Sequence, residues 1–139
     1  MVKKKAVIAR DATTATDATM SRGLKVSEIE ELYFITGRTD SGLDGNPRHP
    51  NDPVGQTRGI IDSLVAMLEQ EGWSMNDVVR MDITYTKDLN RDKYGEAISE
   101  VLRETLKDVN PKPSVGTVRI VDALWKPGYF VEIEVLAAR

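Results

Sequence analysis

The clearest hydrophobic pattern in the chain lies near its C-terminal end, at residues 129–136. Apolar and polar residues alternate there, with Glu132 and Glu134 at two of the polar positions. Strict alternation is typical of a β-strand whose two faces meet different surroundings. The segment therefore predicts a strand with one apolar face and one face that carries two carboxylates. These carboxylates either face solvent, as most strand glutamates do, or lie on a face that is covered by another part of the protein or by a ligand that interacts with a carboxylate.

Two longer segments have apolar residues at the spacing of an α-helix. The first is expected to begin at Asp52 and Pro53, because Asp is a favourable N-cap and Pro suits the first helical position. Gly72 is expected to end it in a left-handed conformation. The second is predicted at about residues 91–107, and the prolines that follow cannot continue a helix.

Five further segments are predicted as strands, at residues 5–10, 24–26, 32–37, 78–86 and 114–121. The second and third of these are expected to form a hairpin. A polar loop at 38–53 is rich in Gly, Pro, Asp and Asn, and loops of this length are usually functional or mobile. The predicted order of elements is β-β-β-α-β-α-β-β.

Two amphipathic helices can cover only one face of such a sheet. They are assigned to the apolar side of the strands at 78–86, 114–121 and 129–136. The opposite face then carries Arg80, Asp82, Thr84, Thr117, Arg119, Glu132 and Glu134, mixed with Val115, Phe130 and Leu136. Glu134 is expected to pair with Arg80 or Arg119. Such a face is typical of a wet barrel interior or of a subunit interface, and we favour the interface.

Composition narrows the class of protein. A chain of 139 residues, 40% of them hydrophobic, predicts a single domain over residues 1–139, with a strand and loop at 1–19. The absence of cysteine excludes disulfides and thiolate chemistry. The net charge of −3 argues against nucleic-acid and membrane partners. No apolar run approaches the roughly 20 residues of a membrane span, and no signal peptide is evident, so we expect a cytoplasmic protein.

The remaining candidates for chemistry carry weak signals. His49 is the only histidine, and a lone histidine in a loop is usually exposed, so no metal site is expected. Asp44, Asp52 and His49 are placed to cap a pocket if the 38–53 loop folds over it. Trp73 and Trp125 are interpreted as packing anchors.

Three stretches of the chain together resemble one protein family. They are residues 20–26 with 32–38, Gln56-Thr57-Arg58 with Asp77-Val78-Val79, and Pro127-Gly128 with Val131-Glu132-Ile133-Glu134. In this order and spacing they resemble the Rid/YjgF family of reactive-intermediate deaminases, over about residues 20–137. The resemblance implies a chorismate-mutase-like α+β fold with one sheet packed on two helices. It also implies a homotrimer with a central barrel-like arrangement of sheets and clefts between subunits.

Members of this family hydrolyse imines and enamines to a ketone or keto acid and ammonia, without a cofactor. Such a reaction requires a placed water, a carboxylate to orient or deprotonate it, and donors for the substrate. By resemblance, Glu132 falls on the family's catalytic glutamate. Thr36 and Gly37 fall on the Ser-Gly pair whose backbone lines the pocket.

Three positions depart from the family pattern. Pro113 stands where the family has the arginine that binds the substrate carboxylate in a bidentate manner. Val115 replaces a residue that is often cysteine, and Met20 replaces a pocket tyrosine. Arg38 or Arg119 is expected to hold the anion instead, although a surface salt bridge is the alternative for each.

The sequence therefore favours a hydrolytic deaminase of a reactive imine, an enamine or a related small C–N metabolite, with a substrate other than the generic one. Glu132 would orient the water in a cleft between subunits. The alternative is a non-catalytic trimeric protein that binds a small molecule in the same cleft. Ribonuclease activity, also attributed to the family, is disfavoured by the acidic balance and the absence of histidine pairs.

Overall fold

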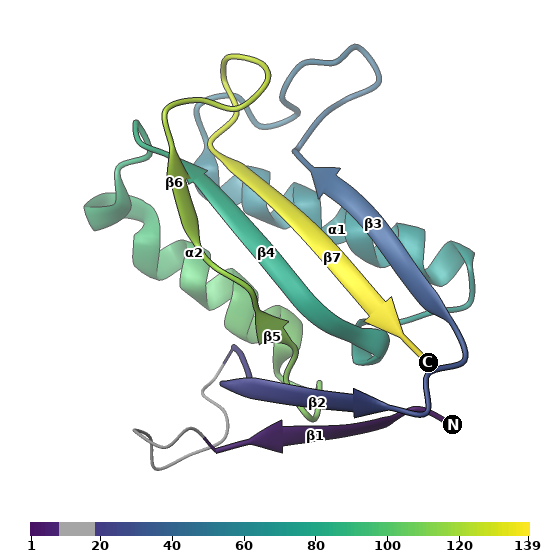
Figure 1. Cartoon of the computed structure of the whole chain (residues 1–139). Helices are drawn as coiled ribbons and strands as arrows, with labels where there is room; N and C mark the ends of the chain where they lie inside the picture. The colour runs from purple at the N-terminus through teal and green to yellow at the C-terminus, as the bar shows by residue number, and fades with distance from the viewer. Residues whose placement is uncertain (9–18) are drawn as a thin grey trace.

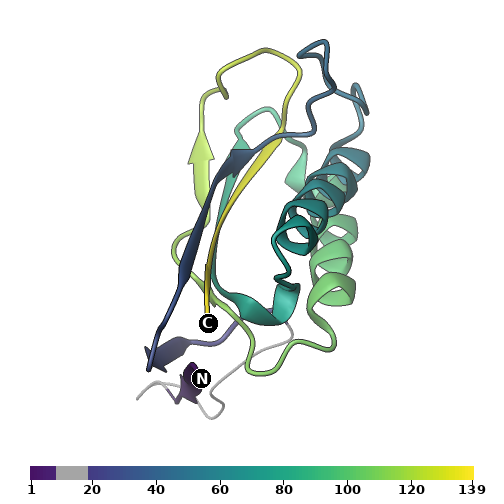
Figure 2. The ribbon, with the colours of Figure 1, turned by 90° about the vertical axis from the view of Figure 1, so that its right-hand side faces the viewer.

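The computed structural model describes residues 1–8 and 19–139 of the chain (Figure 1). One layer is a sheet in the order β3 (Leu32–Arg38), β7 (Val131–Ala138), β4 (Val78–Thr86), with β5 (Ser114–Val115) and β6 (Arg119–Val121) both paired to β4. β7 is antiparallel to both of its neighbours, whereas β5 and β6 are parallel to β4. The second layer consists of α1 (Pro53–Gln70) and α2 (Arg91–Leu106), which cover a single face of the sheet (Figure 2).

Both helices begin at side chains that cap them. The Asp52 carboxylate accepts a hydrogen bond from the Gly55 amide of α1 at 2.9 Å, and Asn90 caps α2 in the same way through the Lys93 amide. Gly72, just beyond α1, has a φ of +76°, the left-handed conformation that glycine adopts without strain. The predicted start and end of the first helix are therefore confirmed.

The core lies between the helices and the sheet. Its fully or almost fully buried members are Ile60, Leu64 and Leu68 of α1, Ile98 and Leu102 of α2, and Val131, Ile133 and Val135 of β7. Burial of each such side chain contributes about 1.5–3 kcal/mol relative to exposure. The alternation seen in the sequence at 129–136 is thus confirmed as the boundary between the core and the uncovered face. The α+β class and the covering of one face by two helices are confirmed with it.

The predicted hairpin is wrong. β2 (Gly23–Ser27) pairs with β1 (Lys3–Val7) in a separate two-stranded sheet, and β3 pairs with β7. The connection after β2 does not form a tight turn, because Glu28 has a φ of +56° and the amides of Glu30 and Glu31 donate to the carbonyl of Arg139. The chain is thereby turned away from β2 and onto the end of β7. β1 also begins two residues before the predicted strand at 5–10, the end of which lies outside the described residues.

The single strand predicted at 114–121 is divided into β5 and β6. Gly116 lies at the break, beside the ion pair of Arg80 and Asp82. A methyl group on Gly116 would come within 2.2 Å of Asp82 Oδ1 and 2.3 Å of Arg80 Nη2. Val118 and Ile120, which were assigned to the covered face, are 47% and 42% exposed at this edge of the sheet.

Among the described residues, no helix is both long enough and apolar enough to cross a membrane.

Candidate functional site

The uncovered face of the sheet carries the charged residues of β7 and β4. Glu132 lies opposite Thr84, and Glu134 lies opposite Asp82, in the antiparallel pairing of these two strands. Side chains of directly paired residues lie on the same face. Glu132 is half-buried, whereas Glu134 is exposed. The two glutamates predicted on this face therefore have different surroundings.

Glu132 lies against the backbone of β3 at Gly37. The register of β3 on β7 shifts between Ile35 and Arg38, and Gly37 lies within that irregularity. A methyl group at Gly37 would come within 2.5 Å of Glu132 Oε1 and 2.9 Å of Cδ. No real side chain makes such a contact, so the carboxylate occupies space that only glycine leaves open. The β3 irregularity thus fixes where the Glu132 carboxylate lies.

Two cavities meet at Glu132. One, of about 240 Å³, extends along the sheet and is lined by Thr36, Gly37, Thr84, Arg119 and both glutamates. The other, of about 200 Å³, extends toward the end of β7 and is lined by Thr39, Ser41, Trp125, Lys126 and Tyr129 together with Glu132. The carboxylate is therefore accessible from two sides.

The arginines of this face pair with Asp82. Arg80 donates to it from Nε at 2.9 Å and from Nη2 at 3.1 Å, and Arg119 Nη1 lies 3.8 Å away. The hydrogen bonds from Arg80 lower the pKa of Asp82, and those to Asp82 raise the pKa of Arg80. The prediction that one of these arginines pairs with Glu134 named the wrong carboxylate. Glu134 acts on the pKa of Arg80 only as a nearby charge.

Thr36, Gly37, Arg119 and Glu132 are brought together, but Arg38 is not part of this group. Arg38 pairs with Ile133, so its side chain lies on the helix-covered face, where Nη2 donates to Ser63 Oγ of α1 at 3.2 Å. The prediction that Arg38 lies in the cleft beside Glu132 is therefore wrong within one subunit. The irregularity in β3 turns the Arg38 side chain to the opposite face of the sheet.

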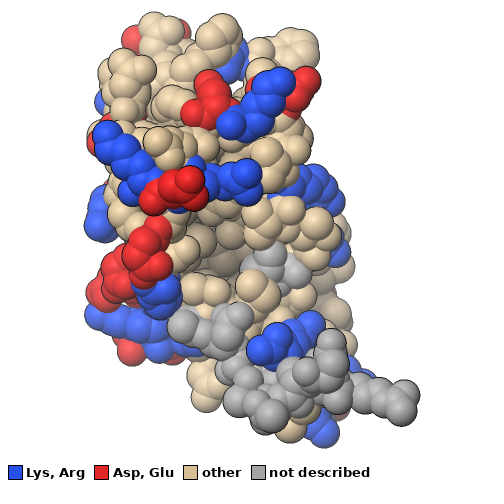
Figure 3. All heavy atoms as spheres, turned by 90° about the vertical axis from the view of Figure 1, so that its left-hand side faces the viewer, with Lys and Arg blue, Asp and Glu red and all other residues tan. Residues whose placement is uncertain are grey.

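Met20 and Val115 lie away from Glu132 in the same chain. Met20 lines a cavity of about 240 Å³ on the helix side, with Met81, Leu102, Leu106 and Val118. Figure 3 faces the side of α2 and β6 and shows a hollow with uncharged walls there. Val115 belongs to β5 and pairs with Met81 of β4. Within one subunit, Met20 does not reach the carboxylate.

Pro113 is buried, and its carbonyl oxygen accepts a hydrogen bond from the Ser21 amide at 2.8 Å. The neighbouring Lys112 directs its ammonium to the end of α2, where it donates to the carbonyl oxygen of Leu106 and, beyond the helix, to that of Val109 at 2.9 Å. This segment therefore serves to join α2 to β5, and neither side chain is placed to bind an anion.

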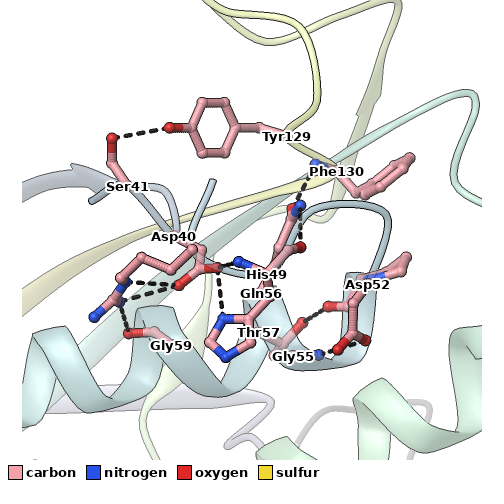
Figure 4. Close-up of polar contacts among 12 residues, drawn as sticks. Asp40, Ser41, His49, Asp52, Gly55, Gln56, Thr57, Gly59, Tyr129 and Phe130 are labelled. Carbon is pink, nitrogen blue, oxygen red and sulfur yellow. Dashed lines mark hydrogen bonds and ion pairs between the residues drawn. The ribbon is translucent and has the colours of Figure 1, made fainter. Parts of the chain in front are cut away.

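A buried carboxylate at Asp40 organises the 38–53 loop, and the sequence reading missed it. Asp40 is fully buried and accepts hydrogen bonds from Arg48 Nε at 3.0 Å and from the His49 amide and Nδ1 at 2.9 and 2.8 Å (Figure 4). A methyl group on Gly59 of α1 would come within 1.9 Å of Asp40 Oδ1. His49 is exposed, as expected, and its ring lies on Asp40. Arg48 Nη2 donates to the carbonyl oxygen of Gly59 at 2.9 Å and so holds the loop against α1. The sequence signal for this contact was Gly59, because a glycine inside a strongly helical segment often marks a close approach of another group.

Gln56 joins the loop, α1 and the start of β7. Its Nε2 donates to the carbonyl oxygens of Gly128 at 2.8 Å and His49 at 3.2 Å, and its Oε1 accepts from the Phe130 amide at 2.9 Å. Figure 4 shows it beneath Phe130. Because Phe130 is two residues before Glu132, this buried amide positions the start of the strand that carries the carboxylate.

Asp52 and Asp44 have local roles instead of capping the pocket. Asp52 caps α1, and Asp44 accepts a hydrogen bond from the Asn46 amide at 3.0 Å.

The arrangement suits chemistry that needs a carboxylate and hydrogen-bonding groups. Among the described residues, no group of three or more His, Cys, Asp or Glu side chains is placed to hold a metal ion. Glu132 can accept a proton from a water in either adjoining cavity, and Arg119, at 53% exposure, can attract an anionic group. A half-buried carboxylate with donors and an open cavity is a common basis for general acid–base catalysis.

The fold and this carboxylate define an α+β protein of the Rid type. The chain belongs to the Rid/YjgF family: the family model described as endoribonuclease L-PSP matches residues 14–139. A RutC family protein of Pyrococcus abyssi is 32% identical over 79 residues, which cover 56% of this chain and 61% of that protein's length.

Solved structures agree on the fold. A protein of unknown function of the conserved Rid family from Yersinia pestis, YyfB, superposes with a TM-score of 0.82 at 18% identity over 98% of both chains. RidA from an Antarctic Psychrobacter superposes with a TM-score of 0.64 at 24% identity, over 96% of this chain and 94% of that one. The predicted chorismate-mutase-like fold is confirmed by these relatives, whereas function has to be argued from the site.

Proposed function

We propose that the protein is a hydrolytic deaminase of a reactive imine, an enamine or a related small C–N metabolite. The observation that carries this proposal is the placement of Glu132, whose carboxylate lies against Gly37 at the junction of two cavities. Family membership supports the same chemistry, because the Rid family includes imine deaminases.

In the proposed reaction, Glu132 accepts a proton from water while the water oxygen bonds to the carbon of the protonated imine, and the electron pair of the C=N π bond moves to nitrogen. The resulting carbinolamine then breaks its C–N bond, and the nitrogen takes up a proton and leaves as ammonia. The remaining hydroxyl group loses its proton to give the keto product, so one water is consumed and one ammonia released. General acid–base assistance of this kind contributes roughly 10²–10⁴-fold to a rate.

We further propose that the uncovered sheet face is the interface of a homotrimer. Phe34 is 75% exposed on this face, beside Leu136 and the charged cluster of Arg80, Asp82 and Arg119. An exposed phenylalanine beside polar groups is typical of surfaces that bind another protein. With clefts between subunits, residues of a neighbouring copy would complete the cavities at Glu132.

The absence of the family arginine points away from the generic substrate. Pro113 is buried where that arginine is expected, and Arg38 is held at Ser63. Arg119 is the cation that shares the 240 Å³ cavity with Glu132, and its single contact to Asp82 is long. Arg119 would attract an anionic substrate toward the sheet face.

The test is ammonia release from imines generated in situ by an amino-acid oxidase. Glu132→Gln removes the proton acceptor with little change in shape and is expected to lose at least 100-fold in rate, within the roughly 10²–10⁴-fold range of general-base assistance. Glu69→Gln is the matched control, because Glu69 is an exposed residue of α1 on the opposite side of the sheet. Equal rates in the two variants would overturn the role given to Glu132.

The second candidate is a trimeric protein that binds a small molecule without turning it over. The observation that favours it is the buried Pro113 in the place of the substrate-binding arginine. A bound ligand would then raise the melting temperature, by mass action on the folded state, with no product formed. Failure to accelerate any imine, together with such stabilisation, would establish this candidate.

A further inference from the structure

The turn before β7 carries an exposed tryptophan beside Glu132. Trp125 is 97% exposed, whereas Trp73 is 5% exposed and packs against Tyr33 with ring centroids 5.7 Å apart. The interpretation of both tryptophans as packing anchors is therefore wrong for Trp125. An indole left in water forgoes a large hydrophobic gain, and tryptophan is enriched where a protein binds a partner or ligand.

The same turn presents a cation. Lys126 is exposed, and its Nζ is 3.4 Å from the carbonyl oxygen of Gly45, at the outer limit of a hydrogen bond. Hydrogen bonds from Asn46 lower the pKa of Asp44, and the charge of Lys126 adds a smaller effect in the same direction. Among the described residues, Lys126 forms no ion pair within 4 Å. The ammonium is therefore available to an anion that enters the cavity.

The turn is also fixed in place. The Tyr129 hydroxyl donates to the carbonyl oxygen of Gly45 at 2.9 Å and lies 2.9 Å from Ser41 Oγ, with the ring buried. The carbonyl oxygen of Gly128 accepts from Gln56. These contacts join the turn to the 38–53 loop and to α1, so Trp125 and Lys126 project from a preorganised backbone. Preorganisation reduces the entropic cost of binding.

The cavity between this turn and Glu132 has room for one ring. Its volume is about 200 Å³, and a protein cavity of roughly 150 Å³ holds benzene. Its lining includes one cation, Lys126, and one carboxylate, Glu132. This pattern is complementary to a molecule that has a carboxylate, a protonated nitrogen and an apolar ring.

We propose that this cavity selects substrates derived from aryl-bearing amino acids, with the ring stacked on Trp125 and the carboxylate paired with Lys126. The imine nitrogen then faces Glu132, which holds the attacking water. This inference rests on the proposed deaminase function and names its substrate class. Lys126 thereby takes the role that the family gives to an arginine at the position of Pro113.

The first test measures binding without turnover. The probes are 3-phenylpropanoate, its neutral amide, its amine analogue 3-phenylpropylamine, and hexanoate, each titrated by calorimetry into the wild type and into Trp125→Leu, Trp125→Phe and Lys126→Met. Trp125→Leu is expected to weaken 3-phenylpropanoate about three- to tenfold, the range of an aromatic contact, with hexanoate unchanged. Trp125→Phe should restore most of this loss.

Lys126→Met is expected to weaken 3-phenylpropanoate about two- to fivefold, as for a solvent-exposed ion pair, with the amide unchanged. Lys25→Met is the matched control, because Lys25 is exposed on β2 in the separate sheet. The proposal would be overturned if 3-phenylpropylamine bound more tightly than 3-phenylpropanoate. It would also be overturned if Trp125→Leu bound every probe with the same affinity as the wild type.

The second test uses turnover and separates this inference from the function on which it rests. Imines from phenylalanine and from norleucine are compared, and Trp125→Leu is expected to reduce the preference for the aryl imine by the same three- to tenfold factor. Turnover with an unchanged preference would overturn the inference and leave the deaminase intact. The expected binding pattern without turnover by any variant would support the aryl-carboxylate site and contradict the deaminase.

Discussion

The Glu132 carboxylate and the α-carbon of Gly37 are in such close contact that a single methyl group on Gly37 would come within 2.5 Å of Oε1. Gly37 lies within the register shift of β3 on β7, and Thr84 of β4 is the cross-strand neighbour of Glu132 on its other side. The geometry of the candidate catalytic group thus depends on a glycine in the neighbouring strand.

Gly37→Ala is therefore expected to displace Glu132 and to reduce imine hydrolysis more than tenfold. The methyl group meets only the end of the flexible Glu132 side chain, which can move away, so stability is expected to fall by less than about 1 kcal/mol in urea denaturation. Gly95→Ala is the control, because Gly95 lies in α2 with no atom within 4 Å of the added methyl group. That substitution is expected to stabilise the helix by about 0.5–1 kcal/mol and to leave the rate unchanged. An alanine at 37 that leaves the rate unchanged would contradict the role given to the close approach.

The buried Asp40 is expected to stabilise the loop that lines the second cavity. Asp40→Ala removes the acceptor for Arg48 and for both donors of His49, at a position with no exposure. The donors left without partners are expected to lower the free energy of unfolding by about 1–3 kcal/mol. This loss would be measured as a lower midpoint of urea denaturation. Asp62→Ala, on an exposed position of α1, is expected to change stability by less than about 0.5 kcal/mol. Similar losses in both variants would argue against the network.

The ion pair of Asp82 and Arg80 predicts a contribution to stability that depends on pH. Hydrogen bonds from Arg80 lower the pKa of Asp82 below its ordinary value of 3.8. A depressed pKa in the folded state stabilises the protein above the unfolded pKa, and the contribution is lost as the pH falls through the folded pKa. Between pH 6 and pH 2.5, the wild type should therefore lose more unfolding free energy than Asp82→Asn. If the unfolding free energies of the two proteins fell in parallel over this pH range, Asp82 would make no pH-dependent contribution.

The exposed Phe34 tests the proposed trimer. Phe34→Glu places a charge on the uncovered face without disturbing the core, since the side chain is 75% exposed. Light scattering after size exclusion is expected to give the mass of a trimer for the wild type and of a monomer for the variant. Leu43→Glu is the control, because Leu43 is fully exposed in the 38–53 loop. A monomeric wild type would refute the interface.

The sequence predicted the elements that have strong local signals. The period of two in β7, the caps at Asp52 and Gly72, and the apolar stripes of both helices all reflect interactions within a few residues. The pairing of β2 with β1 could not be predicted in this way, because it depends on the contact between the 28–31 connection and Arg139 at the far end of the chain. Arg38 was expected in the cleft because it directly follows Gly37, but one irregularity in β3 turns its side chain to the helix-covered face.

The candidate site was predictable only as far as the resemblance extended. Glu132, Thr36 and Gly37 came from matched motifs, and Arg119 came from parity along a predicted strand. The network of Asp40, His49 and Gln56 was missed because each residue is polar in a polar segment, and burial is set by tertiary packing. The prediction for Trp125 was wrong because tryptophan is usually buried. Here the turn before β7 leaves the indole of Trp125 in solvent.

The central claim is most directly tested by ammonia release in the presence of an amino-acid oxidase, with wild type, Glu132→Gln and no protein compared at equal oxidase activity. The account predicts faster release with the wild type, and release by Glu132→Gln that is indistinguishable from the reaction without protein. Equal acceleration by the wild type and by Glu132→Gln would contradict it, because the reaction would then proceed without the carboxylate that lies against Gly37.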